Sequence, residues 1–165
     1  MLMILSGLPG TGKTTVAREL ACRLGAVHIR IDSIEQAIRA AGTLAVPMTD
    51  EGYRVDYAVA EDNLRLGRTV IADSVNPLQI TRQAWRNVAE RAGTKSIDIE
   101  ITCSDLEEHR RRVETRHGDI PGHRLPDWAE VVAREYHAWD RDRVIVDTST
   151  DTIEAAVAKV RARLS

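Results

Sequence analysis

The residues from Gly7 to Thr14 combine glycines, a lysine and a hydroxyl at a spacing suited to holding phosphate. They match the pattern G-x-x-x-x-G-K-[ST] at every fixed position, which a simple glycine-rich turn between a strand and a helix has no reason to do. Such glycines let the backbone turn its N–H groups inward, and a helix starting at the lysine adds its positive end. Lys13 supplies charge for the β- and γ-phosphates of a nucleotide, and the Thr14 hydroxyl is placed for Mg²⁺. The residues expected around the phosphates are Gly7, Leu8, Pro9, Gly10, Thr11, Gly12, Lys13, Thr14 and Thr15.

Asp32 is the first candidate for chemistry on this nucleotide. It follows the apolar stretch 26–31, which we expect to be a strand. A carboxylate that faces the γ-phosphate from the end of a parallel strand can accept the proton of an attacking hydroxyl. The other role open to Asp32 is to cap the helix expected at 33–41, although Ser33 can cap it instead. We therefore favour Asp32 as a general base.

Asp73 is the second candidate, because it ends the β-branched apolar stretch 69–72. In that place a carboxylate holds Mg²⁺ through water or orients the acceptor, whereas its structural alternative is a turn residue before Asn76 and Pro77. The next residue is Ser74, where hydrolytic motor ATPases usually carry a glutamate that activates water. The absence of that base favours transfer to a bound hydroxyl over hydrolysis.

Arg112 and Arg116 are candidates for contact with the transferring phosphate. They lie four residues apart, on one face of an expected helix, and precede a segment that holds two glycines and two prolines. Cations on a mobile lid, here about 112–127, can clamp phosphates and stack on adenine. A solvated run of arginines is the alternative.

Two further groups of residues give weaker signals. His117, Asp119 and His123 suggest zinc only faintly, because their spacing is irregular and no cysteine pair accompanies them. Cys22 and Cys103 stand in apolar surroundings, and we expect both to be reduced core thiols of a cytoplasmic protein.

Strands alternate with helices along the whole chain. The pattern predicts strands at 2–6, 26–31, 69–72, 95–101 and 143–146, and helices at 13–24, 33–41, 50–66, 77–91, 104–116, 128–139 and 150–164. This alternation is typical of a parallel sheet with helices on both faces, and we expect one three-layer α/β domain over 1–165. Ligands of such sheets bind beyond the carboxyl ends of the strands, so the phosphate loop, Asp32 and Asp73 should meet at one edge.

Local signals refine this outline. The helix after 69–72 should begin at Pro77, and the partly polar stretch 95–101 should lie near an edge of the sheet. Asp127 and Glu130 form a capping box. The helix that follows should carry Trp128, Tyr136 and Trp139 on one side, as packing for the core and the lid hinge, with Trp128 also a candidate to border a substrate.

Composition narrows the class of protein. The 165 residues are 43% hydrophobic and 29% charged, with a net charge of −2. That is ordinary for a soluble globular protein, and it argues against a surface that is basic overall. No apolar run approaches the roughly 20 residues of a membrane span, and the N-terminus lacks the basic region of a signal peptide. We expect a cytoplasmic monomer or homodimer.

Taken together, these motifs resemble the P-loop kinases. The nearest likeness is to the AAA_33 branch, which holds polynucleotide 5′-hydroxyl kinases and chloramphenicol phosphotransferase and whose members are often called AAA family ATPases. The likeness covers nearly the whole chain. It is carried by the loop 7–14, Asp32, the segment 73–77, Trp85, Arg112, Arg116 and the segment 134–136.

The resemblance implies a P-loop NTPase fold of the NMP-kinase type, with strand order 2-3-1-4-5, that uses ATP and Mg²⁺. It implies that Asp32 is the general base, that Lys13, Arg112 and Arg116 contact phosphate, and that adenine lies near 147–150. Thr14 and Asp73 would hold the metal. The residues expected at the acceptor are Asp32, Asp73, Asn76 and Arg39.

One departure from the family pattern bears on the acceptor. Polynucleotide kinases typically place an arginine three residues after the base, where it grips the phosphate of the acceptor, but this chain has Glu35 there and Arg39 one helical turn later. This favours a kinase acting on an uncharged small-molecule hydroxyl, such as a nucleoside, sugar or antibiotic. The alternatives are a polynucleotide 5′-hydroxyl kinase and, disfavoured by the short chain and by Ser74, a nucleotide-dependent switch or motor.

Overall fold

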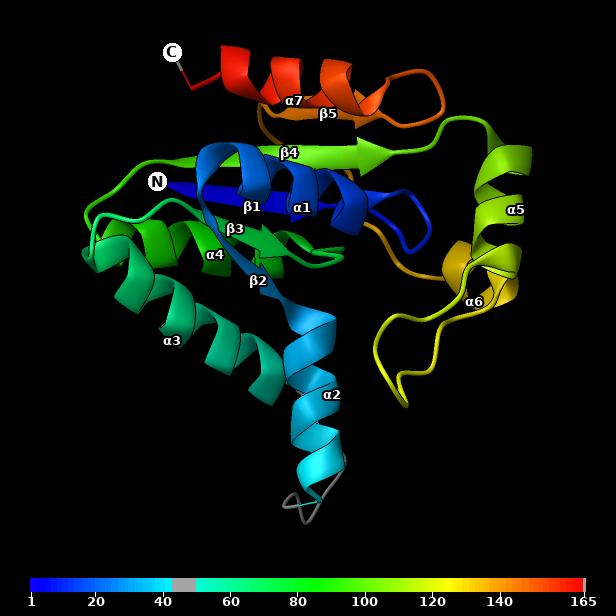
Figure 1. The fold of residues 1–165 in the computed structure, drawn as a ribbon, viewed down its shortest axis with the longest axis horizontal. Helices are drawn as coiled ribbons and strands as arrows, with labels where there is room; N and C mark the ends of the chain where they lie inside the picture. Colours follow the sequence, from blue (N-terminus) through cyan, green and yellow to red (C-terminus); the bar gives the residue numbers. More distant parts are fainter. Residues whose placement is uncertain (43–49, 165) are drawn as a thin grey trace.

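A computed structural model of the chain describes residues 1–42 and 50–164. Its centre is a five-stranded parallel sheet in the order β2-β3-β1-β4-β5 (Figure 1). The strands are β1 Leu2–Ser6, β2 Val27–Arg30, β3 Val70–Asp73, β4 Ser96–Thr102 and β5 Val144–Asp147. This strand order confirms the predicted fold class.

Helices cover both faces of the sheet, with α1 and α7 on one face and α3 and α4 on the other. In chain order the helices are α1 Lys13–Leu24, α2 Ile31–Ala41, α3 Glu51–Arg65, α4 Gln79–Arg91, α5 Leu106–Thr115, α6 Trp128–Val132 and α7 Ile153–Ala162. Alternate residues of a strand face opposite sides of the sheet. In β1, Met3 and Leu5 therefore lie in the core beneath α1 and α7. Leu2 and Ile4 lie in the core beneath α3 and α4. All of β1 is therefore buried, which is why it reads as a continuous apolar run.

The register of the sheet places several strand ends at one level. Leu5 of β1 pairs with Asp73 of β3, and Asp73 in turn pairs with Arg30 of β2. The phosphate loop leaves β1 just beyond this level, and α2 leaves β2 there too. The loop, Asp73 and the first turn of α2, which holds Asp32, therefore meet at the carboxyl edge.

The start of α2 differs from the prediction. The helix begins at Ile31, with Arg30 as an extended N-cap residue that makes no side-chain cap. Asp32 and Ser33 consequently lie within the first turn and do not cap the helix. A carboxylate in the first turn still interacts favourably with the positive end of the helix.

The turn after β3 also differs from the prediction. α4 begins at Gln79 and not at Pro77, because Leu78 is still extended as the N-cap residue. Asn76 turns the chain before it with a positive φ of 44°. Asn76 is fully buried, and its side-chain amide donates to the carbonyl of Leu5 at 2.8 Å. The residue predicted to contact the acceptor therefore links β1 to the turn after β3.

The helix after the capping box is much shorter than predicted. Asp127 and Glu130 form the expected box, but α6 ends at Val132. Tyr136 and Trp139 therefore lie beyond the helix, where a contact from another part of the chain holds them. Helical spacing in the sequence was misleading here because this tertiary contact decides the conformation.

That contact is with Arg82 of α4, which is fully buried. Its guanidinium carbon lies 4.9 Å from the ring centre of Tyr136 and 4.0 Å from that of Trp139. Its N–H groups donate to the carbonyls of Asn76, Pro77, His137 and Ala138. One side chain thus joins the segment after α6 to the turn after β3 through hydrogen bonds and stacking.

As its partly polar pattern predicted, β4 lies near an edge of the sheet, next to the edge strand β5. Asp98 pairs with buried Arg86 of α4 at 2.9 Å, and Glu100 pairs with Arg143 at 2.6 Å. The alternation of apolar and acidic residues along β4 therefore reflects two ion pairs, in which each carboxylate has a guanidinium partner.

Cysteine and membrane predictions have mixed outcomes. Cys103 is buried as expected, but Cys22 is exposed on α1, so it is not a core thiol. The buried residues of that helix lie on its other side and include Val16 and Leu20. None of the helices in the described ranges is long and apolar enough to cross a membrane.

Replacing Arg82 by lysine should destabilise the protein by roughly 2–4 kcal/mol, because an ammonium cannot stack between two rings and also reach four carbonyls. Unfolding in urea measures this loss. The matched control is Arg91→Lys in the same helix, where an exposed arginine pairs with Glu61, and it should change stability by less than about 1 kcal/mol. Equal effects of the two variants would show that Arg82 does not hold the segment after α6.

Candidate active site

The phosphate loop joins β1 to α1, and its glycines are required by what surrounds them. Gly7 has a φ of 145°, and a Cβ at this position would overlap the carbonyl oxygen of Ile101 in β4. At Gly10, which has a φ of 86°, a Cβ would lie 2.5 Å from Val113 of α5. Packing against β4 and α5 therefore fixes the shape of the loop together with its own glycines.

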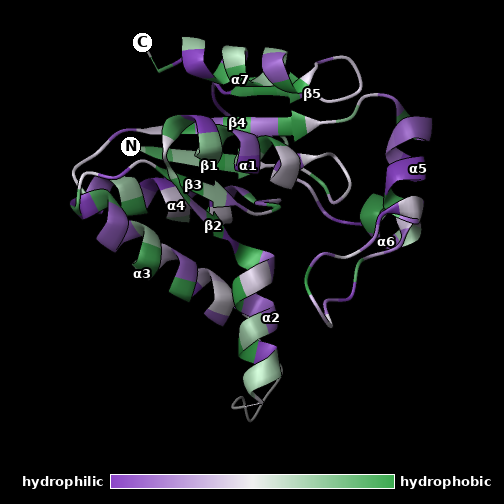
Figure 2. Cartoon of the chain, viewed as in Figure 1, coloured by the Kyte–Doolittle hydropathy of each residue, from purple (hydrophilic) through white to green (hydrophobic). Residues whose placement is uncertain are grey.

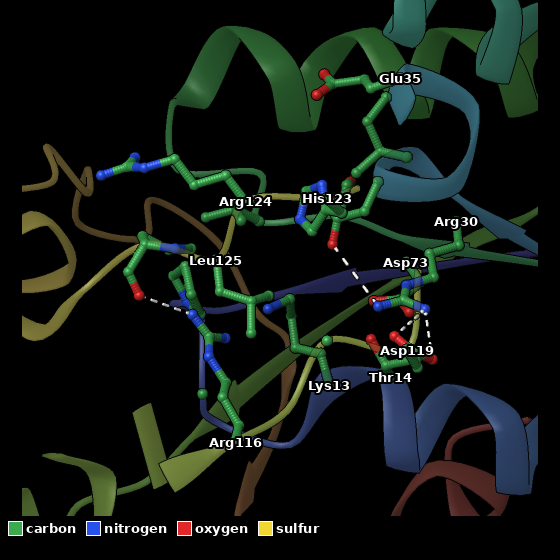
Figure 3. Close-up of a pocket in the computed structure, with 18 of the residues that line it drawn as sticks. Lys13, Thr14, Arg30, Glu35, Asp73, Arg116, Asp119, His123, Arg124 and Leu125 are labelled. Carbon is green, nitrogen blue, oxygen red and sulfur yellow. Dashed lines mark hydrogen bonds and ion pairs between the residues drawn. The ribbon is translucent and has the colours of Figure 1, made fainter. Parts of the chain in front are cut away.

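Lys13 lies in the first turn of α1, with its side chain in the pocket (Figure 3). Its Nζ donates to the carbonyl of Leu8 at 3.1 Å, and the residue is only 9% exposed. Burial lowers the pKa of Lys13, although the nearby carboxylates of Asp73 and Asp32 oppose that shift. A buried ammonium at the start of a helix is stabilised further by an anionic ligand.

Asp73 ends β3 and is 3% exposed. Its Oδ2 lies 3.1 Å from Nε2 of His28 on β2. Burial alone would raise its pKa, but His28, Lys13 and Thr14 together outweigh burial and hold the pKa of this carboxyl below its usual value. The site therefore contains an ionised carboxylate that is oriented by a histidine.

Thr14 and Asp73 lie beside one another and offer oxygen donors at one point of the pocket (Figure 3). Oxygen is the ligand type that Mg²⁺ prefers. Within residues 1–42 and 50–164 there is no group of three or more His, Cys, Asp or Glu residues that could hold a metal ion. Mg²⁺ commonly takes its remaining ligands from phosphates and water, so these two residues fit a cation that binds with a nucleotide.

A cavity of about 630 Å³ connects the phosphate loop, α2 and the segment after α5. Asp32 projects into it from the first turn of α2 with a side chain 41% exposed, and its Oδ2 lies 4.0 Å from Nη2 of Arg30. The predicted site residues that line the cavity are Pro9, Gly10, Gly12, Lys13, Thr14, Asp32, Arg39, Asp73, Arg112 and Arg116. The structure thus brings a half-exposed carboxylate and a buried lysine into one space.

Other residues predicted at the phosphates shape the loop through their own contacts. The Thr11 hydroxyl donates to the carbonyl of Leu8 at 2.9 Å. The N–H of Gly7 donates to the carbonyl of Val75 at 3.1 Å, which ties the loop to the turn after β3. Thr15 is exposed on α1. Gly7, Thr11 and Thr15 are therefore not among the residues that line the cavity.

Arg112 and Arg116 lie at the end of α5, and both line the cavity. The guanidinium of Arg112 donates to the hydroxyl of Thr148 at 2.8 Å and to its carbonyl at 3.0 Å. The Thr148 hydroxyl also lies 2.8 Å from the carbonyl of Thr11, so this contact joins the segment after β5 to the phosphate loop. Arg116 donates to the carbonyl of Pro126 at 3.1 Å and closes the base of the segment between α5 and α6.

Asp119 ties that segment to the sheet and to α1. Its carboxylate accepts two hydrogen bonds from Arg30 of β2, at 2.9 and 3.0 Å (Figure 3). It accepts another from Arg18 of α1. Arg30 and Arg18 hold the pKa of Asp119 well below its ordinary value. Both oxygens of Asp119 are therefore bonded to arginines. This speaks against a zinc site that would combine Asp119 with His117 and His123.

His109 of α5 contacts the phosphate loop directly. This buried residue has its Nε2 2.9 Å from the carbonyl of Pro9. Its ring meets Trp128 of α6 edge-on, with 5.2 Å between the ring centres. Trp128 therefore packs against α5 and is not among the residues that line the cavity. In this way α6 supports α5, which is hydrophilic along most of its length (Figure 2).

The end of the cavity away from the phosphate loop is lined by α2 and α3. Figure 3 places Glu35 there, at the opposite end from Lys13 and Thr14. Its Oε2 accepts a hydrogen bond from Arg39 at 2.8 Å. Gly52 of α3 lies against it, because a Cβ at Gly52 would be 2.5 Å from Cγ of Glu35. The absence of a side chain at Gly52 lets α3 close on α2.

Asp56 lies behind this wall, one turn after Gly52 on α3. It is 1% exposed, and neither of its carboxylate oxygens has a hydrogen-bond partner within the described ranges. Burial raises the pKa of Asp56 to about 7, and the neighbouring carboxylates of Glu35, Asp32 and Asp73 act in the same direction. Folding thus places a carboxyl where its ionisation is unfavourable.

Several of these residues were not identified from the sequence. His28 and Arg30 lie in a short strand whose alternation gives no sign of their partners, and His109 is a single buried residue in a highly charged helix. Asp56 did carry a signal, since it falls at helical spacing with buried Ala60. A carboxylate on the buried stripe of a helix calls for an explanation by function.

The sheet and the phosphate loop define a P-loop nucleotide-binding domain with the strand order of the NMP kinases. Residues 2–135 match the family AAA_33, described as an AAA domain. The chain belongs to that family.

Similar proteins have been described as kinases or bind nucleotide analogues. The chain is 26% identical over 166 residues to a probable adenylyl-sulfate kinase of Aeropyrum pernix, covering 93% of this chain and 86% of that protein. Kti12 of Chaetomium thermophilum in complex with ADP-AlF3 superposes with a TM-score of 0.73 at 24% identity, covering 99% and 97% of the two chains. The APS kinase of Mycobacterium tuberculosis in complex with AMPPNP and APS gives 0.72 at 20% identity, covering 99% and 96%. These two likenesses establish the fold.

Asp56→Asn should stabilise the protein at high pH. The pKa of Asp56 is raised from 3.8 to about 7 on folding, so the folded state holds the proton more tightly and the wild type loses stability as pH rises through this interval. Asparagine cannot ionise, so the gain should grow with pH and reach roughly 1–4 kcal/mol at pH 8. Urea unfolding between pH 5 and pH 8 measures it.

The control for this series is Asp62→Asn, at an exposed position of the same helix. Its effect should stay within about 0.5 kcal/mol at every pH. A gain from Asp56→Asn that is the same at pH 5 and pH 8 would contradict the ionisation argument.

Asp119→Asn should loosen the segment between α5 and α6 with little effect on global stability. Arg30 and Arg18 lose their charged partner, but the carboxylate of Asp119 is exposed to water, and pairs with such a group contribute only about 0–1 kcal/mol. Cleavage of this segment by trypsin should become several-fold faster at an unchanged melting temperature, because local opening is easier than global unfolding.

The control is Glu114→Gln, which removes an exposed pair with Arg110 inside α5. It should leave the rate of cleavage unchanged. If Asp119→Asn is cleaved no faster than this control, Asp119 does not hold the segment in place.

Proposed function

We propose that the protein is an ATP-dependent phosphotransferase, which moves the γ-phosphoryl group of Mg·ATP to a hydroxyl of a small molecule such as a nucleoside, sugar or antibiotic. The observation that carries this proposal is that Asp32 and Lys13 line the same cavity. A carboxylate opposite a phosphate-binding lysine suits deprotonation of an acceptor hydroxyl. The presence of Ser74, and not a glutamate, directly after Asp73 also supports transfer over hydrolysis.

The donor end of the cavity would bind the nucleotide. The N–H groups of the phosphate loop and the ammonium of Lys13 would hold the β- and γ-phosphates. Thr14 and Asp73 would hold Mg²⁺, which neutralises phosphate charge when bound. His28 keeps the carboxylate of Asp73 ionised and oriented.

The transfer step follows from these positions. The oxygen of the acceptor hydroxyl attacks the γ-phosphorus, and the new O–P bond forms as the bond to the β–γ bridging oxygen breaks and ADP leaves. Asp32 accepts the proton of the hydroxyl. Arg112 and Arg116, which line the cavity from the end of α5, would stabilise the charge on the transferring group.

The comparisons support kinase chemistry but leave the acceptor open. One relative is named an adenylyl-sulfate kinase, and the two superposed structures hold AMPPNP or ADP-AlF3. A polynucleotide 5′-hydroxyl kinase is the alternative. Glu35 speaks against it, because this carboxylate lines the acceptor end of the cavity, where such an enzyme needs to bind a phosphate.

Asp32→Asn should lower the turnover of phosphoryl transfer by roughly 10²–10⁴-fold, because an amide cannot accept the proton. Transfer of labelled γ-phosphate to a panel of small hydroxyl compounds and 5′-hydroxyl oligonucleotides measures turnover and names the acceptor. Binding of ATP, measured by calorimetry, should stay near that of the wild type because Asp32 does not hold the donor.

Lys13→Ala serves as the comparison, because it should differ from Asp32→Asn in its effect on ATP binding. It should weaken binding of ATP as well as turnover, because the phosphates lose their ammonium partner. Undiminished turnover in Asp32→Asn would rule out Asp32 as the base. Transfer to oligonucleotides alone would favour the polynucleotide kinase.

A further inference from the structure

Arg30, the last residue of β2, is shared between two carboxylates from different parts of the chain. Its Nη1 donates to both carboxylate oxygens of Asp119, at 2.9 and 3.0 Å. Its Nη2 lies 4.0 Å from Oδ2 of Asp32, in the first turn of α2. The planar guanidinium, with N–H groups that point in fixed directions, can face two partners at once. One nitrogen thus serves the segment between α5 and α6, and another faces the proposed base.

The surroundings of Arg30 fix its position. Its side chain is only 15% exposed, and in the sheet it pairs with Asp73 of β3. Figure 3 shows Arg30 beside Asp73 and Asp119. Burial alone would lower the pKa of Arg30, but Asp119, Asp73 and Asp32 outweigh burial and raise this pKa above its ordinary value. The guanidinium therefore supplies positive charge among three carboxylates, and it offsets the repulsion between Asp32 and Asp73.

Asp32 has few other contacts that could hold it. Its side chain is 41% exposed, and within residues 1–42 and 50–164 no hydrogen bond fixes its carboxylate. Lys13 and Arg116 attract it electrostatically, but neither forms an ion pair with it. A carboxylate in this situation can rotate among several conformers, whereas a general base has to stay within hydrogen-bond reach of the acceptor hydroxyl. The pair with Arg30 is the contact that can select the productive conformer.

We propose that Arg30 is a positioning residue, which directs the carboxylate of Asp32 toward the acceptor hydroxyl while Asp119 holds the segment between α5 and α6 against β2. This role rests on the proposed function, in which Asp32 is the base. The same segment also lies against α2, since a Cβ at Gly122 would be 2.8 Å from Nε2 of Gln36. Closing this segment over the cavity and orienting the base thereby become one event.

Arg18 provides a matched control for Arg30. Both arginines bind Asp119, but Arg18 lies on α1 and does not line the cavity. Arg30→Gln and Arg18→Gln each leave Asp119 with one arginine, so trypsin should cleave after Arg124 several-fold faster in both. At saturating ATP and acceptor, Arg30→Gln should lower kcat by roughly 10–100-fold, because a misplaced base loses its alignment. Arg18→Gln should keep the wild-type kcat and change KM at most.

Turnover is measured as transfer of labelled γ-phosphate to adenosine, glucose, chloramphenicol and a 5′-hydroxyl oligonucleotide, and as hydrolysis of ATP with water as the acceptor. Binding of ATP, measured by calorimetry, should stay near that of the wild type in both variants. Arg30→Lys keeps the charge but offers one ammonium to two partners, so it should restore part of the kcat that Arg30→Gln loses. Circular dichroism checks folding. Asp119→Asn, which removes the anchor of Arg30, should also lower kcat and serves if Arg30→Gln does not fold.

The Asp32→Asn background tests whether Arg30 acts through the base. There, Arg30→Gln should lower kcat by no more than about twofold, because no base is left to direct. If the losses of the two single variants add in full, Arg30 has a separate role and its assignment as a positioning residue is overturned.

The remaining outcomes separate the role of Arg30 from the proposed function. Equal kcat in Arg30→Gln and Arg18→Gln would show that Arg30 only anchors the segment, and weaker binding of ATP by Arg30→Gln would show that it contacts the donor. Either result overturns the positioning role while phosphotransfer stands. If the wild type binds ATP but neither transfers phosphate to a member of the panel nor hydrolyses ATP, the proposed function fails and this role falls with it. A loss of kcat that is specific to Arg30→Gln and disappears in the Asp32→Asn background supports both.

Discussion

The packing of the phosphate loop between β4 and α5 is the constraint on which the site depends. Gly7 lies against the carbonyl of Ile101, and Gly10 lies against Val113, so neither can carry a side chain without moving a neighbouring element. His109 adds a polar contact with the carbonyl of Pro9. These contacts fix the shape of the loop without a ligand, and a preformed loop has less ordering entropy to lose on binding.

Burial alone does not set the charge of the carboxylates in this cavity. Asp73 and Asp56 are both almost fully buried, yet the pKa of Asp73 is lowered and that of Asp56 is raised. The difference lies in their partners, since Asp73 has His28 and Lys13 beside it whereas Asp56 has acidic neighbours. One fold thus keeps an ionised carboxylate beside the phosphate loop and, on α3, a carboxyl whose ionisation is unfavourable.

Features that depend on neighbouring residues could be predicted from the sequence. The sheet order followed from the alternation of elements together with the family resemblance, and the phosphate loop from eight adjacent positions ending at Thr14. Features set by distant contacts were not predictable in this way. The early end of α6 depends on Arg82 from another helix, and the partner of Asp73 is His28, 45 residues away in the chain. For Asp56 the sequence indicates only a polar residue on the apolar face of a helix, and it does not predict that Glu35, Asp32 and Asp73 lie near it.

Arg82 has one more consequence, which concerns how such a protein diverges. It fixes the return of the chain after α6, just as His109 fixes α5 at the other side. The residues 117–126 therefore span two anchored points. Asp119 holds these residues at a third point, through Arg30 and Arg18. Under the proposed function, insertions and deletions on either side of Asp119 would change this wall of the cavity without moving the phosphate loop, so substrate range would drift across descendants of one ancestral chain while their use of nucleotide is retained.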